Sequence, residues 1–217
     1  MVKKVAIILT GCGLYEGTEI NEAVITMLSL EKAGINYEPY GFNRKEPAIN
    51  HITQNKTFFK RNTMQESARI TRGKIKNIKE INKEYYSGVV VVGGYGATKI
   101  LSDFNKREVD FSIDEDFYSF ASIIRDAKKP ALYMCIASLL LPKIYKKPIC
   151  TIGTDKKKAA MIMKIGGIHE EKLYNEFSFD EKNMIISTPA FMEAKNLAEL
   201  EEGISNSVSK FSKILNN

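Results

Sequence analysis

The chain has 217 residues, 44% of them hydrophobic and 27% charged, which is ordinary for a globular protein with a sizeable core. Its net charge of +6 comes from lysines scattered among acidic residues, not from one basic stripe with interleaved aromatics, so nucleic-acid binding is not expected. No apolar run reaches the roughly 18 residues that predict a membrane span. Three cysteines without a C-x-x-C motif argue against a disulfide framework and a zinc site, and they predict a cytoplasmic location.

The first 40 residues predict a βαβ unit. The apolar run 5–9 is expected to form a strand, and a loop over 10–18 follows it. Apolar residues at helical spacing predict a helix over 19–32, which Gly34 would cap. A second strand is expected over 35–40. This order predicts an α/β fold with a mostly parallel sheet and helices on its faces, in a single domain over residues 1–217.

The rest of the chain continues to alternate between predicted strands and helices. Residues 43–84 are more polar, so their secondary structure is less clearly predicted. In chain order, the expected elements are a helix over 64–72 that Gly73 stops, a short helix over 78–84, a buried strand over 88–92, a short helix over 97–101, an amphipathic helix over 112–128, strands over 149–152, 172–177 and 184–187, and a final helix over 190–215.

Cys135 lies between an apolar run that predicts a buried strand and a leucine-rich run that predicts a helix, with Pro142 near the end of that helix. A cysteine at a sharp strand-to-helix turn is placed like the nucleophile of an elbow. The helix amino terminus would favour the thiolate over the thiol. The alternative is a small, inert, buried side chain, which is the more common state of a free cysteine.

Four loops follow strands and are expected to gather at the carboxyl edge of the sheet, where open α/β sheets bind ligands. They span residues 10–18, 93–97, the Cys135 turn and 187–191. Cys12, Tyr95, Thr188 and Pro189 are the pocket candidates that these loops supply.

Gly93 and Gly94 end a buried strand, where glycine lets the backbone approach a ligand. With the N–H of Ile136 they would form an oxyanion hole. A tight turn that requires positive φ explains the same glycines without any function.

Glu19 and Glu22 share a face at the start of the first helix, and either is a candidate acid and base beside the Cys135 thiol. Acidic residues in a first helical turn are also common simply because they favour the helix dipole. Only His51 and His169 could complete a Cys-His arrangement, and neither adjoins Cys135 in sequence, so a protease or glutaminase is disfavoured.

Seven segments together resemble the ElbB branch of the DJ-1/PfpI superfamily of class I glutamine amidotransferase-like proteins. They are residues 11–23, 49–53, 66–73, 93–97, 134–137, 152–155 and 188–192, and the resemblance runs nearly end to end. Two positions depart from the pattern: Val92 stands where the superfamily often has proline, and Ser138 stands where the branch resembles Ala-Pro.

The resemblance implies a flavodoxin-like three-layer sandwich, usually a homodimer, with Cys135 as the reactive residue. It maps the partner glutamate most simply to Glu22, with Glu19 as the alternative, and the oxyanion glycines to Gly93 and Gly94. It also implies a glutathione-independent glyoxalase, a lyase acting on a small aldehyde without metal or cofactor. The alternative is a redox-responsive module with an oxidisable Cys135. The branch name alone provides a link to isoprenoid biosynthesis.

Overall fold

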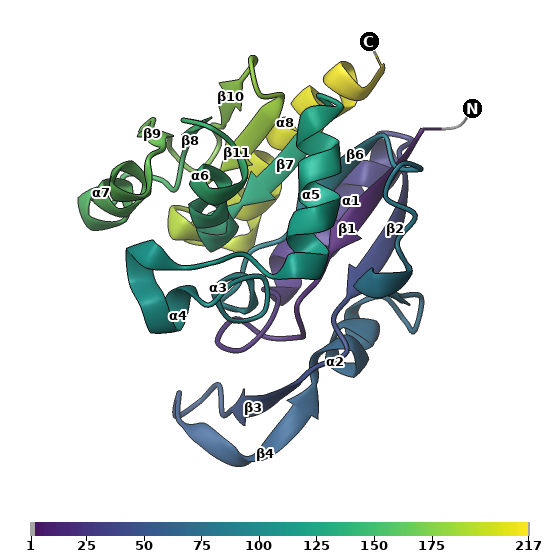
Figure 1. The fold of residues 1–217 in the computed structure, drawn as a ribbon, viewed down its shortest axis with the longest axis vertical. Helices are drawn as coiled ribbons and strands as arrows, with labels where there is room; N and C mark the ends of the chain where they lie inside the picture. The colour runs from purple at the N-terminus through teal and green to yellow at the C-terminus, as the bar shows by residue number, and fades with distance from the viewer. Residues whose placement is uncertain (1–2, 217) are drawn as a thin grey trace.

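The computed structural model describes residues 3–216, and a seven-stranded sheet runs through its centre (Figure 1). In spatial order the strands are β10 (Ser178–Asp180), β11 (Ile185–Thr188), β7 (Ala131–Met134), β6 (Gly88–Val91), β1 (Lys4–Ile8), β2 (Asn36–Gly41) and β5 (Lys76–Asn77). Every neighbouring pair is parallel except β10 and β11. This order, with β1 in the interior, requires crossovers, and helices provide them.

Helices cover both faces of the sheet. They are α1 (Ile20–Lys32), α2 (Thr63–Ile70), α3 (Gly96–Lys99), α4 (Phe104–Arg107), α5 (Glu115–Asp126), α6 (Leu141–Ile144), α7 (Lys156–Ile165) and α8 (Leu197–Asn216). Figure 1 shows α5 in front of the sheet and α1 with α8 behind it. The expected flavodoxin-like three-layer sandwich is therefore confirmed. None of the helices within residues 3–216 is long and apolar enough to cross a membrane.

The register of the sheet aligns the carboxyl ends of its central strands. Val91 lies opposite both Ile8 and Tyr133, and Met134 lies opposite Thr188. The strands β1, β6, β7 and β11 are almost entirely buried, so their ends are held rigidly. The four loops that follow these strands consequently meet at one edge of the sheet, as the sequence predicts.

Most of the expected elements are present, with shifted ends. The βαβ start is confirmed, and Gly34, at φ +69°, follows the last turn of α1 as expected. The amphipathic helix is shorter than 112–128, because the side chain of Asp114 caps α5 by accepting a hydrogen bond from the N–H of Phe117. The helix expected over 78–84 is a single 3-10 turn, Ile78–Glu80.

Two predictions at the carboxyl half are wrong. Residues 172–177 are not a strand: the backbone there crosses α8 so closely that a Cβ on Gly203 would lie 2.0 Å from the Tyr174 carbonyl oxygen. The final helix starts at Leu197 and not at residue 190, because a turn intervenes. Pro142 lies near the end of the helical run after Cys135, as expected, because the 3-10 helix Cys135–Leu140 continues directly into α6, which ends at Ile144.

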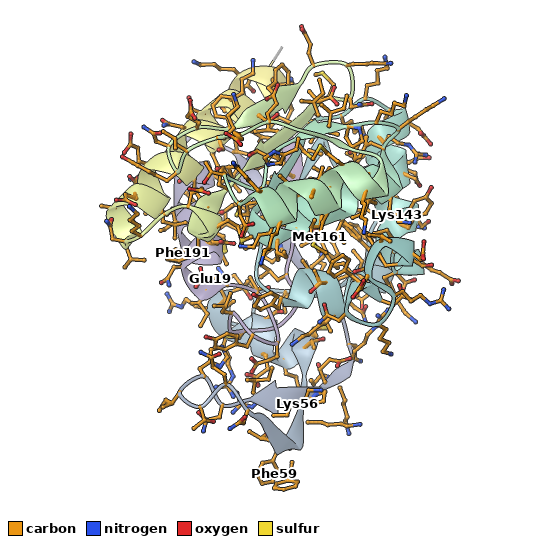
Figure 2. All side chains as sticks on the ribbon, turned by 90° about the vertical axis from the view of Figure 1, so that its left-hand side faces the viewer. Glu19, Lys56, Phe59, Lys143, Met161 and Phe191 are labelled. Atoms are coloured by element: carbon orange, nitrogen blue, oxygen red, sulfur yellow. The ribbon has the colours of Figure 1, made fainter. Side chains whose placement is uncertain are left out.

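Besides short elements such as β5 and α4, two larger features were not predicted. The first is α7, whose amino terminus is capped by the Asp155 side chain. The second is the arm, an antiparallel hairpin of β3 (Lys45–Ile49) and β4 (Lys56–Asn62) that projects from the carboxyl edge of the sheet (Figure 1). Phe59, near its far end in Figure 2, is 77% exposed. Because this segment is rich in polar residues, its strands could not be recognised from the sequence. Apart from the central sheet and the arm, β8 (Ile149–Cys150) and β9 (Ile168–His169) pair as a short, separate parallel sheet.

Candidate active site

Cys135 occupies a strained turn at the end of β7. Its φ is +55°, a left-handed conformation that is uncommon for a residue with a Cβ, and a 3-10 helix, Cys135–Leu140, follows at once. The turn directs the thiol toward the carboxyl edge of the sheet, although only 4% of the residue is exposed. The elbow expected from sequence is present in this geometry.

The thiol of Cys135 lies in a pocket that favours its neutral form. Burial raises the pKa of this thiol well above its ordinary value, and the nearby Glu22 raises it further. The backbone N–H groups of Ile136 and Gly94 act in the opposite direction but are outweighed. The expectation that a helix terminus would favour the thiolate is therefore wrong, since the turn is a short 3-10 helix and burial dominates.

Glu22 faces the elbow from the first turn of α1 and is completely buried. Its Oε1 accepts a hydrogen bond from the N–H of Phe191 at 3.3 Å, whereas its Oε2 has no hydrogen-bond partner among residues 3–216. Burial, and then the charge of Glu19, raise the pKa of Glu22 to about 8. Glu22 is therefore predominantly a neutral acid at pH 7.

Gly93 separates the acid from the thiol and leaves no space for a larger residue. A Cβ at this position would lie 2.3 Å from Oε2 of Glu22 and 2.5 Å from Cβ of Cys135. The backbone N–H of Gly93 acts on Glu22, where it lowers the pKa of that carboxyl, while the N–H of Gly94 acts on Cys135. The backbone N–H of Gly93 therefore faces the Glu22 carboxyl. The N–H groups that face the Cys135 sulfur come from Gly94 and Ile136.

Glu19 has a different place from Glu22. It is the amino-terminal cap of α1, with its Oε2 accepting a hydrogen bond of 2.7 Å from the N–H of Glu22. Its Oε1 accepts one from the Asn21 side chain at 3.2 Å. The two glutamates therefore have different roles: Glu22 faces the thiol, and Glu19 caps the start of the helix. Figure 2 shows Glu19 close to Phe191, whose backbone holds Glu22.

The loop after β11 contributes a second strained residue. Ala190 is fully buried and has a φ of +50°. This turn directs the N–H of Phe191 at Glu22. From the sequence, Thr188 and Pro189 were expected to line the pocket. Thr188 is buried, and its hydroxyl donates a hydrogen bond to the Glu176 carbonyl. Pro189 precedes the 3-10 turn Ala190–Met192. The role of Phe191 was missed, because a backbone N–H leaves no residue-type signal.

The remaining pocket candidates, Cys12 and Tyr95, have their contacts with other groups. Cys12 is half-buried beside Glu66 and Arg69 of α2, and burial raises the pKa of its thiol. Tyr95 is 43% exposed and stacks on Tyr15, with ring centroids 6.4 Å apart. Neither Cys12 nor Tyr95 is among the groups that shift the pKa of Cys135.

The two histidines do not complete a Cys-His arrangement. Nε2 of His51 lies 3.6 Å from Oε2 of Glu16, and Nε2 of His169 accepts the N–H of Ile152 at 3.3 Å. Neither imidazole influences the pKa of Cys135. Within residues 3–216, no cluster of three or more His, Cys, Asp or Glu side chains has the geometry to hold a metal ion.

The chain is similar in sequence to curated mitochondrial proteins. It is 31% identical to the ES1 protein homolog, mitochondrial, of Rattus norvegicus over 218 residues, which cover 95% of this chain and 82% of the relative. It is also 31% identical to the human glutamine amidotransferase-like class 1 domain-containing protein 3, mitochondrial, with coverage of 95% and 81%. No protein-family model matches the chain. The expected cytoplasmic location is contradicted, because the names of these relatives place them in mitochondria.

Solved structures show the same fold. An isoprenoid biosynthesis protein with an amidotransferase-like domain from Ehrlichia chaffeensis superimposes with a TM-score of 0.90 at 32% identity, covering 98% of this chain and 99% of the other. A DJ-1 superfamily protein from Salmonella typhimurium superimposes with a TM-score of 0.57 at 16% identity, covering 99% and 91%, which is a likeness of fold alone.

Proposed function

Because this chain belongs to the ES1/ElbB-like branch of the DJ-1/PfpI, class I glutamine amidotransferase-like superfamily, we propose that it is a glyoxalase that converts glyoxal to glycolate without glutathione. The observation that carries this proposal is the buried pair of Cys135 thiol and neutral Glu22 acid on either side of Gly93. A nucleophile next to a proton-carrying group is what addition to an aldehyde and subsequent isomerisation require.

The first step forms a hemithioacetal. The sulfur of Cys135 attacks one aldehyde carbon of glyoxal, the C=O double bond opens, and Glu22 gives its proton to the new alkoxide while the thiol proton replaces it. The N–H groups of Gly94 and Ile136, which already face the sulfur, stabilise the negative charge on oxygen in the transition state.

The second step is an isomerisation through an enediol. One oxygen of the Glu22 carboxyl takes the proton from the carbon that bears sulfur, and the other gives its proton to the neighbouring carbonyl oxygen. The same carboxyl then gives a proton to the second carbon, while its other oxygen takes the hydroxyl proton from the carbon that bears sulfur, and the C=O bond of a thioester forms there. A carboxyl that starts protonated suits this exchange, and the N–H of Phe191 fixes its orientation.

The third step is hydrolysis of the resulting thioester. Water adds to the thioester carbon, the carbon–sulfur bond breaks, and glycolate leaves while the thiol regains its proton. The sum is glyoxal plus water giving glycolate, so no oxidant, reductant or cofactor is required. Only 4% of Cys135 and 9% of Ile136 are exposed, which favours a substrate of a few heavy atoms.

Loss of the thiol tests this proposal. Cys135→Ser is expected to abolish glycolate formation from glyoxal, measured by ¹³C NMR with labelled glyoxal. Cys150→Ser is the matched control, because Cys150 is a buried thiol in β8, away from the elbow, and its variant is expected to retain activity. Full activity in Cys135→Ser would refute the proposal.

A redox-responsive module is the second candidate. The N–H groups of Gly94 and Ile136 that face the sulfur, and the acid of Glu22, would also hold the oxygens of a sulfinic acid. Two equivalents of peroxide would supply these oxygens and leave as water. Intact-mass measurement after mild peroxide, beside the glyoxal assay, separates the candidates: oxidation confined to Cys135 with negligible turnover favours the module.

The name of the Ehrlichia chaffeensis protein refers to isoprenoid biosynthesis. No group around Cys135 indicates an isoprenoid ligand, so the proposed substrate remains a small aldehyde.

A further inference from the structure

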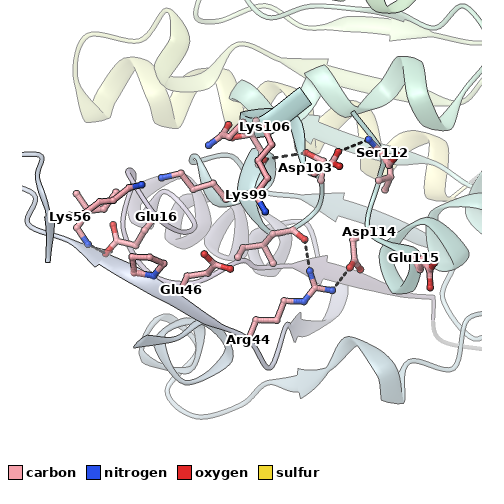
Figure 3. Close-up of a pocket in the computed structure, with 17 residues that line it drawn as sticks. Glu16, Arg44, Glu46, Lys56, Lys99, Asp103, Lys106, Ser112, Asp114 and Glu115 are labelled. Carbon is pink, nitrogen blue, oxygen red and sulfur yellow. Dashed lines mark hydrogen bonds and ion pairs between the residues drawn. The ribbon is translucent and has the colours of Figure 1, made fainter. Parts of the chain in front are cut away.

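A pocket of about 610 Å³ lies between the arm and the segments that follow β6, away from Cys135 (Figure 3). The arm forms one wall with Glu46, Pro47 and Lys56, and Glu16 comes from the loop after β1. Residues 98–106 and 112–115 form the opposite wall. This volume is within the range of pockets that hold small metabolites.

Charged side chains of both signs line this pocket, and only some of them are paired. Arg44 is paired with Asp114, and Asp103 with Arg107. In contrast, Lys56, Lys106 and Glu46 form no ion pair and no side-chain hydrogen bond within residues 3–216. In the hairpin register Lys56 is opposite Ile49, and Glu46 is opposite Arg61, whose guanidinium is paired with Glu66 instead.

Two ammonium groups converge at one end of the pocket. Lys56 from the arm and Lys99 from α3 extend toward each other in Figure 3, and the charge of Lys56 contributes to the lowered pKa of Lys99, after burial. Lys99 is held in place, since its ammonium donates to the Tyr15 carbonyl. Two cations that face one another are stabilised when a carboxylate lies between them.

Two carboxylates lie close to these cations. Glu16 and Glu46 are near enough to Lys99 to raise its pKa, yet neither forms an ion pair with it within the described chain. Oε2 of Glu16 is buried and accepts no hydrogen bond of ordinary geometry, with only His51 at 3.6 Å. A ligand that is purely anionic would be repelled by these carboxylates, and one that is purely cationic by the two lysines.

We propose that this pocket binds a small zwitterion of the α-amino acid class. The ligand carboxylate lies between Lys56 and Lys99, and its ammonium group faces Glu46 and Glu16. This site is distinct from the Cys135 elbow and does not depend on the activity proposed there.

The test is binding to the whole protein. Each of the twenty standard amino acids is screened by ligand-observed NMR, and the Kd of the best binder is measured by calorimetry. At least one amino acid is expected to bind with a Kd of about 1 mM or lower. Its α-hydroxy acid, which lacks the ammonium, and its decarboxylated amine, which lacks the carboxylate, are each expected to bind at least about tenfold more weakly.

Residues of the arm supply the variants. Lys56→Met and Glu46→Gln are expected to weaken binding at least about tenfold, while Lys45→Met, an exposed lysine of β3 outside the pocket, leaves the Kd unchanged. Thermal unfolding verifies that all three fold. Absence of binding by every amino acid, equal binding of the hydroxy acid or the amine, or an unchanged Kd in Lys56→Met would each overturn the proposal.

Discussion

Glu22 is well placed for proton transfer, but its burial makes the folded protein less stable as the pH rises and the carboxyl tends to ionise. Its pKa is about 8 in the folded protein and near 4.5 when exposed. Between these values the folded state retains a proton that the unfolded state has lost. The contribution of Glu22 to stability is therefore complete below about pH 4.5 and is lost as the pH rises toward 8, by at most about 1.4 kcal/mol per pH unit.

Replacement of this acid by its neutral isostere should stabilise the protein at alkaline pH. The free energy of unfolding of Glu22→Gln, measured by urea denaturation, is expected to exceed that of the wild type at pH 8 by a few kcal/mol, because glutamine cannot ionise. Near pH 4.5 the two proteins should be about equally stable. A less stable variant at pH 8 would show that the carboxyl is ionised and satisfied there.

The same pKa sets an expected pH dependence of activity. The proposed steps use Glu22 in its protonated form, so kcat/KM for glyoxal should fall above about pH 8. Ionised Glu22 would also raise the pKa of the Cys135 thiol, which acts in the same direction. The pH profile of glycolate formation measures this limb, and a rate that continues to rise above pH 8 would instead indicate a thiolate-limited reaction.

At the scale of elements, the amino terminus of α1 couples two glutamates of different function. Glu19 caps the helix, and its charge raises the pKa of Glu22. Glu19→Gln is therefore expected to move the alkaline limb of the pH profile to lower pH while retaining activity near pH 6, because the acid itself remains. An unchanged limb would show that Glu19 carries no charge in the working enzyme.

The central elements and the reactive turn could be predicted from the sequence, since both are local. Apolar runs predicted β1, β6, β7 and β11, and Cys135 lies at the turn where an elbow was expected. The family resemblance favoured Glu22 and left Glu19 as the alternative, because both share a face of α1. The structure separates them through cap geometry and burial.

Features that depend on backbone direction or tertiary contact were not predictable. The N–H of Phe191 reaches Glu22 because Ala190 has a left-handed backbone conformation. No residue type in this loop predicts that conformation. The arm was missed because β4 is exposed along most of its length and neither of its strands shows the alternation of apolar and polar residues that predicts a strand. The pKa of Cys135 was misjudged because burial, a tertiary property, outweighs the local turn.

For the whole molecule, the family resemblance implies a homodimer, and this stays a prediction. Light scattering after size-exclusion chromatography is expected to give the mass of two chains. Phe58 and Phe59 of the arm are 105% and 77% exposed, an uncommon state for phenylalanine in an isolated chain. The mass of one chain across micromolar concentrations would contradict the dimer.

The central claim is that a protonated, buried Glu22 works with the Cys135 thiol on glyoxal. Its most direct test is kcat/KM for glycolate formation at pH 7 in Glu22→Gln, measured beside the wild type by ¹³C NMR. A loss of at least about a hundredfold is predicted, with the protein folded and Cys135 still present, because general acid–base catalysis typically contributes that much. Glycolate formation at the wild-type rate in Glu22→Gln would contradict the account.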